Sequence, residues 1–594
     1  MVRNRVLLTV LLVWALAMIV PDMARFVRPL GSFGFYANND GLVYDVLGPF
    51  DDKTASPAWK AGIREGDRID LTRMHCLPYD AKTCGSVLAA LGGLQYVIPG
   101  RSATLEILGT SDRPARQVVL VAGERPVDWL IRLVLLLDQI AGIAVVLAAA
   151  WLVWTRPGKM SWGFFLYVLW FNPGQSYEYY ALLQQWPLLL LAQNAAGCVA
   201  QAAGYAGLLL FAIRVPTDEA AADWKALEHS LPLVGIFLTL VLFASYGGLF
   251  GYQTETATRA GILVGLVVAL CALTILLARR RTQKPEDYQR LRWVIWGCLI
   301  GLPAYTIAEL GSQTTFFATT PWGDLTPPEH VIGLLYLING VLCLFVFEAI
   351  RSPRVVNVSI PLRRVTILGL TLSIPVLLLH RQIDLIREHL DLPNWAWVGV
   401  GAVVLYLISR LHEIAVHLAD RYFNRRLDRA EEELSQAILK ARSLTEIERL
   451  LADDAYRVLN LASAAAFRRI GPVFRRLETG DGWDGCATTL SSNEPLIAST
   501  SKRGAFSLDG ALADDVKLPE GLKRPVLGVP AASRIRCFAL TLYGPHTSGA
   551  DLDSYERAML GRLGDTAADV YAELENNELR KTIEVLEGEL ATDN

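Results

Sequence analysis

The chain has 594 residues, of which 52% are hydrophobic and 19% are charged, and its formal net charge is −3. Soluble proteins carry about 25% charged residues, so this composition points to a membrane protein. The near-neutral charge offers no electrostatic footprint for nucleic acid. The eight cysteines include no Cys-x-x-Cys pair, so nothing supports a zinc or thioredoxin-type site.

Ten apolar segments are predicted to cross the membrane, because a spanning helix needs about 20 apolar residues. The first lies within an N-terminal anchor, residues 1–21. No small-x-small cleavage site follows it, which favours an uncleaved anchor over a signal peptide. The other nine segments fall within a predicted bundle over residues 129–410, at 130–154, 161–178, 187–213, 231–250, 260–278, 293–310, 331–350, 365–380 and 395–410.

The basic residues predict how the chain is oriented, because cytosolic loops carry an excess of Lys and Arg. Three of these residues lie in the short external loops, at Arg259, Arg381 and Arg387. Sixteen lie on the other side, at Arg3, Arg5, Arg156, Lys159, Arg214, Lys225, Arg279, Arg280, Arg281, Lys284, Arg290, Arg292, Arg351, Arg354, Arg363 and Arg364. The asymmetry predicts a multi-pass protein of the bacterial inner (cytoplasmic) membrane with both termini in the cytosol and residues 22–128 outside.

Three acidic residues lie inside predicted spans, where ionisable groups are functional candidates. Asp138 has Arg132 nearby as a structural partner, and Glu348 lies beside Arg351 at the cytosolic edge. Glu309 lies near the external end of its span, within reach of water. These residues are either structural or part of a transport or proton path, and the sequence leaves both readings open.

Residues 35–123 are predicted to form one external domain of strands and turns. Its predicted elements are a strand over 41–46, the segment SPAWKAGIREGDRI from Ser56 to Ile69, a helix over 81–91, and strands over 103–108 and 117–121. Cys76 and Cys84 are the two cysteines of this domain. An oxidising compartment favours pairing them, so we expect a disulfide between the strand after Ile69 and the next helix.

SPAWKAGIREGDRI resembles a characteristic segment of PDZ domains, in which a helix-to-strand corner falls at Ala61-Gly62 and a turn at Gly66-Asp67. The resemblance implies a β/α domain to which a peptide adds as an extra strand. The positions that correspond to the family's binding loop and strand are Gly41, Leu42, Val43 and Tyr44. The family loop reads Gly-Leu-Gly-Phe, so the second glycine is missing here. The alternative is a PDZ-like domain that packs or dimerises without binding a peptide.

The apolar segment that begins at Trp395 continues without Pro or Gly into charged sequence as far as Leu444, which predicts one unbroken helix. Its part over 411–444 would connect the bundle to the cytosolic domain. Apolar residues recur there at spacings of three and four, as in a coiled-coil seam: Leu427, Ala430, Leu434, Ala437, Ala441 and Leu444. An ordinary amphipathic helix packed on a domain fits the same spacing.

Residues 445–570 are predicted to be a mixed α/β domain, with a helix over 444–459, strands over 464–469, 524–530 and 535–543, and a helix over 551–573. This order resembles a GAF domain, a family that holds small ligands on its sheet or dimerises. The Asn-Lys-x-x-x-Asp-Glu set of its cyclic-nucleotide-binding members is not evident. Cys486 is a lone cysteine in a loop, which is typical of an inert thiol rather than a chromophore attachment site.

Residues 571–594 form the clearer predicted coiled coil, and we expect a parallel homodimer through it. Its seam has 4-3-4-3-4 spacing and comprises Ala572, Asn576, Leu579, Ile583, Leu586 and Leu590. An asparagine in a seam costs stability but specifies register, which is the role expected for Asn576.

The sequence gives little support to an enzyme. The nearest match to His-Glu-x-x-His is His412-Glu413-Ile414-Ala415-Val416-His417, where the histidines are five residues apart and therefore about 140° around a helix. A zinc-binding pair is four apart. We expect no catalytic residues, metal or cofactor.

The whole order resembles the sensory half of bacterial multi-span sensor histidine kinases of the competence and quorum-sensing type, without the kinase domain. That resemblance implies a multi-domain protein: a polytopic helical bundle of about ten spans, an external PDZ-like domain and a cytosolic GAF-like domain flanked by coiled-coil helices. It would relay an external peptide or envelope signal to a separate cytosolic partner. The alternatives are a membrane scaffold that recruits proteins through the PDZ-like domain, and a transporter-like bundle.

Overall fold

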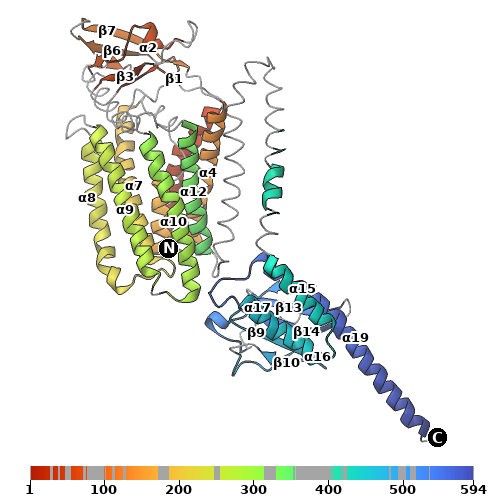
Figure 1. Cartoon of the computed structure of the whole chain (residues 1–594). Coiled ribbons are helices and arrows are strands. Elements are labelled where there is room, and N and C mark those ends of the chain that lie inside the picture. Colours follow the sequence, from red (N-terminus) through yellow and green to blue (C-terminus); the bar gives the residue numbers. More distant parts are fainter. Residues whose placement is uncertain are drawn as a thin grey trace. The chain divides into compact units, whose positions relative to one another are not determined.

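The computed structural model divides the chain into two compact units (Figure 1). The first unit contains residues 1–283 and 290–353, and the second contains 284–289 and 354–594. The described residues of the first part of the chain are 2–26, 31–37, 41–46, 55–70, 75–76, 99–100, 102–109, 114–124, 129–171, 186–246, 254–281, 283–312, 329–351 and 355. Those of the second part are 403, 406–407, 409–416, 418, 425–479, 483–491, 504–508, 517–533 and 536–592.

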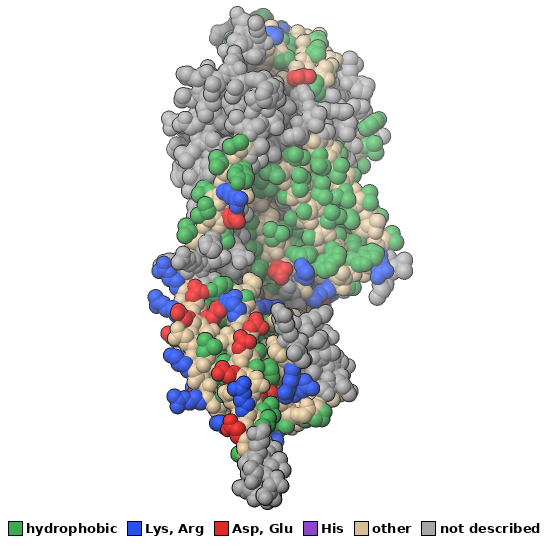
Figure 2. All heavy atoms as spheres, turned by 90° about the vertical axis from the view of Figure 1, so that its right-hand side faces the viewer, with side chains coloured by type: hydrophobic (Ala, Val, Ile, Leu, Met, Phe, Trp, Pro, Cys, Tyr) green, Lys and Arg blue, Asp and Glu red, His purple; other side chains and the backbone are tan. Residues whose placement is uncertain are grey.

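Eight long helices belong to the described bundle. They are α1 (Val2–Ile19), α4 (Trp129–Thr155), α5 (Lys159–Phe171), α7 (Pro187–Arg214), α8 (Lys225–Tyr246), α9 (Thr254–Arg279), α10 (Pro285–Ser312) and α12 (Glu329–Arg351). Seven of them, all except α5, contain stretches long and apolar enough to cross a membrane. Figure 2 shows hydrophobic side chains covering the described face of the bundle, as expected of helices that contact lipid.

The other three predicted spans have different outcomes. The third, over 161–178, corresponds to α5, which has 13 residues in the described chain and is shorter than a full span. The span over 365–380 lies outside the described residues, as does most of the one over 395–410.

Helix α5 lies at the centre of the bundle, since nine of its residues are buried. It packs against α7 through glycines on both helices. A Cβ built on Gly163 would lie 2.8 Å from the carbonyl oxygen of Gly207, and one built on Gly207 would lie 2.6 Å from the carbonyl oxygen of Gly163. Small residues let two backbones approach closely, which is how helices associate in lipid.

Arginines bind the carboxyl ends of the helices at one end of the bundle. Arg156 donates to the carbonyl oxygens of Ile350 and Arg351, Arg279 to that of Ile213, and the Arg290 Nε to that of Ala349 at 2.7 Å. Helices leave their last carbonyls without intrahelical partners, and a cation there also complements the helix dipole. Basic residues at the α4–α5 and α9–α10 connections therefore lie at the same end of the bundle.

Residues 31–124 form the N-terminal sheet domain. The central strand β6 (Ser102–Leu108) pairs with β4 (Arg68–Ile69), β5 (His75–Cys76) and β7 (Arg116–Val121). Two smaller antiparallel pairs join β1 (Gly31–Ser32) to β8 (Gly123–Glu124), and β2 (Phe35–Ala37) to β3 (Val43–Val46). Strand β6 alternates half-buried and buried residues, so one of its faces covers a core that includes Ile63, Ile69 and Leu105.

The segment from Ser56 to Ile69 adopts the predicted corner and turn. The Ser56 hydroxyl caps α2 (Pro57–Lys60) by accepting a hydrogen bond from the amide of Trp59. Gly62 and Gly66 then have φ of +79° and +86°, a region that glycine enters without steric cost. Asp67 is buried, and its Oδ2 accepts from the Arg64 amide at 3.0 Å, which fixes the turn before β4. The predicted helix over 81–91 lies outside the described residues.

The C-terminal sheet domain contains an antiparallel six-stranded sheet. In spatial order its strands are β11 (Thr489–Ser491), β10 (Val473–Thr479), β9 (Ala464–Ile470), β14 (Cys537–Tyr543), β13 (Leu527–Ala532) and β12 (Phe506–Ser507). Three of these strands, β9, β13 and β14, were predicted. The predicted helix over 444–459 is also present, as α16 (Leu444–Arg449), a π-helical turn (Leu450–Asp454) and α17 (Ala455–Leu459).

The predicted unbroken helix over 395–444 is wrong at its carboxyl end. Helix α15 (Arg425–Leu439) stops five residues early, and Ser443 is extended and caps α16 with its side chain. The predicted seam residues also belong to the domain itself. Leu434 and Ala441 are buried in its core, and Leu427, Ala430, Ala437 and Leu444 pack against it. In the described structure this stretch is therefore the amphipathic helix, and its apolar stripe faces its own domain. Residues 419–424, upstream of α15, lie outside the described ones.

The last helix joins the domain to the predicted coiled coil without a break, since α19 extends over Ser554–Thr592. Its first part is buried, with Leu563, Ala567 and Tyr571 in the core. Beyond that point the apolar seam is open to solvent, because Leu579 and Ile583 are 59% and 52% exposed. The side chains of Leu586 and Leu590 are outside the described set.

His546 lies in the loop between β14 and α19, where it is held between two hydrogen-bond acceptors. Its Nδ1 lies 2.8 Å from the carbonyl oxygen of Leu459, and its Nε2 lies 3.0 Å from Glu556 Oε2. Two acceptors favour the doubly protonated ring. Burial lowers the pKa of His546, but the hydrogen bond and charge of Glu556 outweigh this effect and the net shift is upward. Glu556 is itself fixed by a capping box with Asp553.

This contact predicts a pH-dependent stability for the C-terminal sheet domain. A raised pKa in the folded state stabilises the fold below the unfolded value of about 6.5, and this contribution is lost as pH rises through the folded pKa. The fragment 419–594 contains His546 as its single histidine. We expect its urea midpoint to fall as pH rises from about 6 to 8. His546→Gln should remove most of that slope; an equal slope in the variant would contradict the assignment.

Candidate functional site

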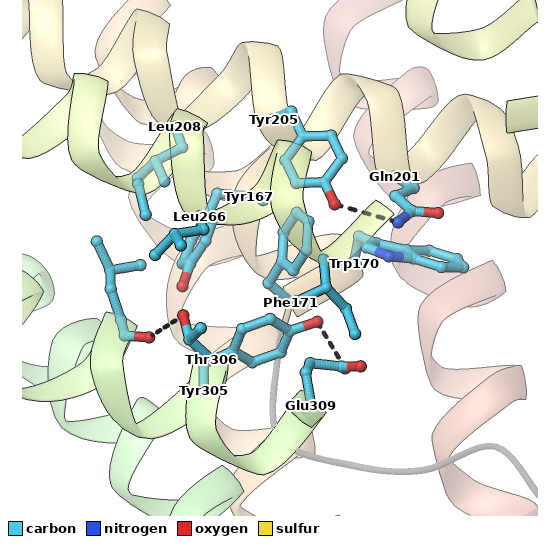
Figure 3. Close-up of a pocket in the computed structure, with 14 residues that line it drawn as sticks. Tyr167, Trp170, Phe171, Gln201, Tyr205, Leu208, Leu266, Tyr305, Thr306 and Glu309 are labelled. Atoms are coloured by element: carbon cyan, nitrogen blue, oxygen red, sulfur yellow. Dashed lines mark hydrogen bonds between the residues drawn. The ribbon is translucent and has the colours of Figure 1, made fainter. Parts of the chain in front are cut away.

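The bundle contains a partly open cavity of about 170 Å³ between α5, α7, α9 and α10 (Figure 3). Its wall is mainly aromatic and apolar with a few polar groups, which is the usual composition of a small-molecule site. The lining residues are Tyr167, Trp170, Phe171, Gln201, Tyr205, Leu208, Ile262, Gly265, Leu266, Ala269, Leu302, Tyr305, Thr306 and Glu309.

Phe171, the last residue of α5, is the centre of the aromatic wall. Its ring centroid lies 5.0 Å from that of Tyr205, 5.4 Å from that of Tyr305 and 5.4 Å from that of Tyr167. Rings at these separations make favourable pair contacts. The wall therefore joins α5, α7 and α10, and Figure 3 shows the rings of Phe171, Tyr205 and Tyr305 grouped together.

Glu309 lies at one edge of the cavity, close to the carboxyl end of α10. Its Oε1 accepts a hydrogen bond from the Tyr305 hydroxyl at 2.9 Å and one from the Tyr336 hydroxyl of α12 at 3.3 Å. Two phenol donors on one oxygen orient the carboxylate. On the opposite wall, the Gln201 amide donates to the Tyr205 hydroxyl at 3.2 Å. The site thus presents both a fixed carboxylate and hydroxyl groups.

A buried asparagine connects this site to α12. Asn339 is 1% exposed, donates to the carbonyl oxygen of Phe171 at 2.7 Å, and lies 3.2 Å from the Tyr167 hydroxyl. A satisfied polar group of this kind fixes the register of packed helices in an apolar setting. It therefore holds the end of α5, and with it Trp170 and Phe171, in place.

The other two acidic residues predicted inside spans do not line the cavity. Asp138 is 1% exposed within α4, and Glu348 is half-buried near the carboxyl end of α12. The structure therefore does not assemble the three carboxylates into one site. Among the described residues, no group of His, Cys, Asp and Glu is placed to hold a metal ion.

The peptide-binding residues predicted in the N-terminal sheet domain are already engaged in its own pairing. The Val43 amide donates to the Asp67 carbonyl, the Val43 carbonyl accepts from Gly66, and the Gly41 carbonyl accepts from Ile69. Leu42 is 40% exposed, and Tyr44 continues β3, which pairs with β2. Peptide addition at 41–43 would have to displace these bonds. For the predicted Cys76–Cys84 disulfide, Cys76 ends β5, and Cys84 lies outside the described residues.

Cys486 in the C-terminal sheet domain is half-exposed and packs at the edge of a small core that contains Phe474, Trp483 and Leu540.

The comparisons with known proteins identify no family: no family model matches the chain, and no curated protein matches it. The structure itself defines the class: the described residues are mostly helical and include seven helices suited to crossing a membrane, which is typical of a multi-pass membrane protein.

Sequence reasoning found Glu309 but missed the rest of the cavity. Its aromatic residues lie on helices far apart in the sequence, and each looks like an ordinary apolar residue of a span. One usable signal was the accumulation of Tyr, Trp and Phe in the short segment 162–171, ahead of Asn172-Pro173-Gly174.

Proposed function

We propose that this chain is a non-catalytic sensory protein of the bacterial inner membrane. In this proposal the N-terminal sheet domain, a PDZ-like domain, faces outward and the C-terminal one, a GAF-like domain, lies in the cytosol. An external peptide or envelope signal changes the bundle, and the cytosolic domain passes the change to a separate partner. The clustering of Arg156, Arg279 and Arg290 at one end of the bundle supports this orientation.

Strand β2 is the better candidate for peptide addition in this proposal. Among the described residues it pairs with β3 on one edge, and no pairing is found for its other edge. A sheet edge without a partner strand accepts an extended peptide through backbone hydrogen bonds. Gly34, immediately before β2, has φ +80° and lies against the Ser56 side chain, so this turn cannot accept a larger residue without moving.

The observation that carries the proposal is the open apolar seam of α19. Leu579 and Ile583 are exposed on a helix whose earlier turns are buried in the domain core. Apolar residues at seam spacing on a solvated helix are best buried against a second copy. A parallel homodimer would couple the two cytosolic domains and provide a surface for a partner.

Cysteine cross-linking in membranes tests this dimer in the full-length protein. Seam positions of a parallel pair bring their Cα atoms within disulfide reach, about 4.4–6.8 Å. We expect Leu579→Cys to form a covalent dimer rapidly on mild oxidation. Arg580→Cys is the matched control, because its side chain lies about 100° around the helix. Equal cross-linking of the two variants, or none in either, would show that the seam is not a dimer interface.

A further inference from the structure

The bundle cavity has the chemistry of a site for a positively charged organic group. Five of its fourteen lining residues are aromatic: Tyr167, Trp170, Phe171, Tyr205 and Tyr305. Ring faces attract cations through their quadrupole, and cages of this kind recognise quaternary ammonium groups. Glu309 is the charged residue in the described wall, so an ionised Glu309 makes the wall net negative.

The geometry places the carboxylate and the rings around the same space. Tyr305 lines the cavity, contacts the Phe171 ring edge to face, and donates to Glu309 Oε1. The hydroxyl hydrogen of Tyr305 is therefore directed at the carboxylate, and the Tyr305 ring borders the cavity. Figure 3 shows Glu309 and Tyr305 side by side, with Phe171 and Tyr205 beyond them.

The volume limits the size of the ligand. The cavity holds about 170 Å³, and an engineered cavity of about 150 Å³ is known to accept benzene. One compact group of that size fits, such as a trimethylammonium head with a short chain.

We propose that this cavity binds a small organic ammonium ion, with the aromatic rings contacting its methyl or methylene groups and Glu309 balancing its charge. The inference deepens the proposed sensory function, because it gives the bundle a ligand of defined chemistry. The same ammonium group occurs on free amines and on phospholipid headgroups, and the experiment separates these two sources.

Choline is a suitable probe, and 3,3-dimethylbutan-1-ol is its neutral isostere of nearly equal shape. Binding is measured by equilibrium dialysis of radiolabelled choline against the full-length protein in phosphatidylglycerol nanodiscs, which contain no amine. We expect saturable binding of choline that the neutral isostere displaces at least tenfold less well. Because both compounds are tested on the native chain, this comparison does not depend on a variant that folds.

Two variants locate the site. Glu309→Gln keeps hydrogen-bonding capacity and removes the charge, and we expect at least about tenfold weaker choline binding. Gly265→Val introduces a side chain beside Tyr205, since a Cβ there lies 3.3 Å from the Tyr205 hydroxyl, and it should block binding. Gly235→Val is the matched control, because a Cβ at that position has Ala206 Cβ at 4.0 Å as its one close neighbour.

The outcomes are decisive in both directions. Preference for choline, with loss in Glu309→Gln or Gly265→Val and retention in Gly235→Val, supports the proposal. If phosphatidylcholine added to the discs competes with choline, the source is a lipid headgroup. If it does not compete, the source is a free ammonium compound. Equal affinity for choline and the neutral isostere, or binding of neither, overturns the proposal. Choline binding that leaves the Leu579→Cys cross-link unchanged would uphold the site and count against the sensory relay.

Discussion

Replacing Arg468 by leucine is expected to destabilise the C-terminal sheet domain by about 3–5 kcal/mol, a large part of the stability of a typical domain. Glu448 is completely buried in this domain, and its Oε1 lies 3.3 Å from the Arg468 guanidinium. The charge of Glu448 also acts on Tyr571. Burial first, and then the negative charge of Glu448, holds the pKa of Tyr571 well above its usual range. Removing the guanidinium leaves a carboxylate in an apolar core without its cation.

The measurement is urea unfolding of the fragment 419–594, which has its own hydrophobic core and contains Trp483 as its single tryptophan. Trp483 is 1% exposed, so its fluorescence reports loss of the core directly. The control is the double variant Arg468→Leu with Glu448→Leu. Replacing both members of a buried ion pair by apolar residues is often tolerated, so the double variant should be more stable than the single one. A single variant as stable as the native fragment would contradict this account.

Gly207→Ala is expected to lower the stability of the bundle by about 1–3 kcal/mol or more, because it adds an atom where two helices touch. The new Cβ would lie 2.6 Å from the Gly163 carbonyl oxygen and 2.9 Å from Leu166 Cβ. Backbone on one side and a packed side chain on the other cannot both move aside. Helix α5 would be pushed off α7, and Phe171 with it.

Thermal unfolding of the purified full-length protein in detergent measures this effect. Gly235→Ala in α8 is the matched control, because a Cβ there meets Ala206 Cβ at an ordinary 4.0 Å. Alanine also favours a helix over glycine, so the control should match or slightly exceed the native protein. A native-like transition for Gly207→Ala would mean that α5 and α7 are not packed through these glycines.

The elements that the sequence predicted correctly are those whose local pattern has one interpretation. The apolar stretches of α4, α7, α9, α10 and α12 are too long for anything except a buried or membrane helix. Two positive-φ glycines and a capping serine define the corner from Ser56 to Ile69. Strand β14 and the first four residues of β9 are short, mainly apolar runs at the centre of the sheet.

The elements that it missed depend on partners distant in the chain. Seam spacing over 427–444 predicts an apolar stripe but not what covers it, and the cover is the domain's own core, including α19. Strand β10 is rich in arginine, with Arg475 and Arg476 in its middle, so it lacks the apolar signal of a strand. The cavity is assembled from four helices, and no local pattern connects Tyr205 of α7 to Tyr305 of α10.

The most direct test of the sensory account changes the helical phase between the bundle and the C-terminal sheet domain. In this account the helix continues upstream of α15, so one residue inserted after Arg426 rotates the bundle side by about 100° relative to the domain, whereas seven residues nearly restore the phase. The measurement is the set of transcripts whose level differs from that in cells lacking the protein. It is made in cells that carry the native chain or either insertion. The account predicts that the one-residue insertion abolishes the response and the seven-residue insertion retains most of it. Equal responses in all three chains would contradict a relay and favour a scaffold that recruits proteins through its N-terminal sheet domain.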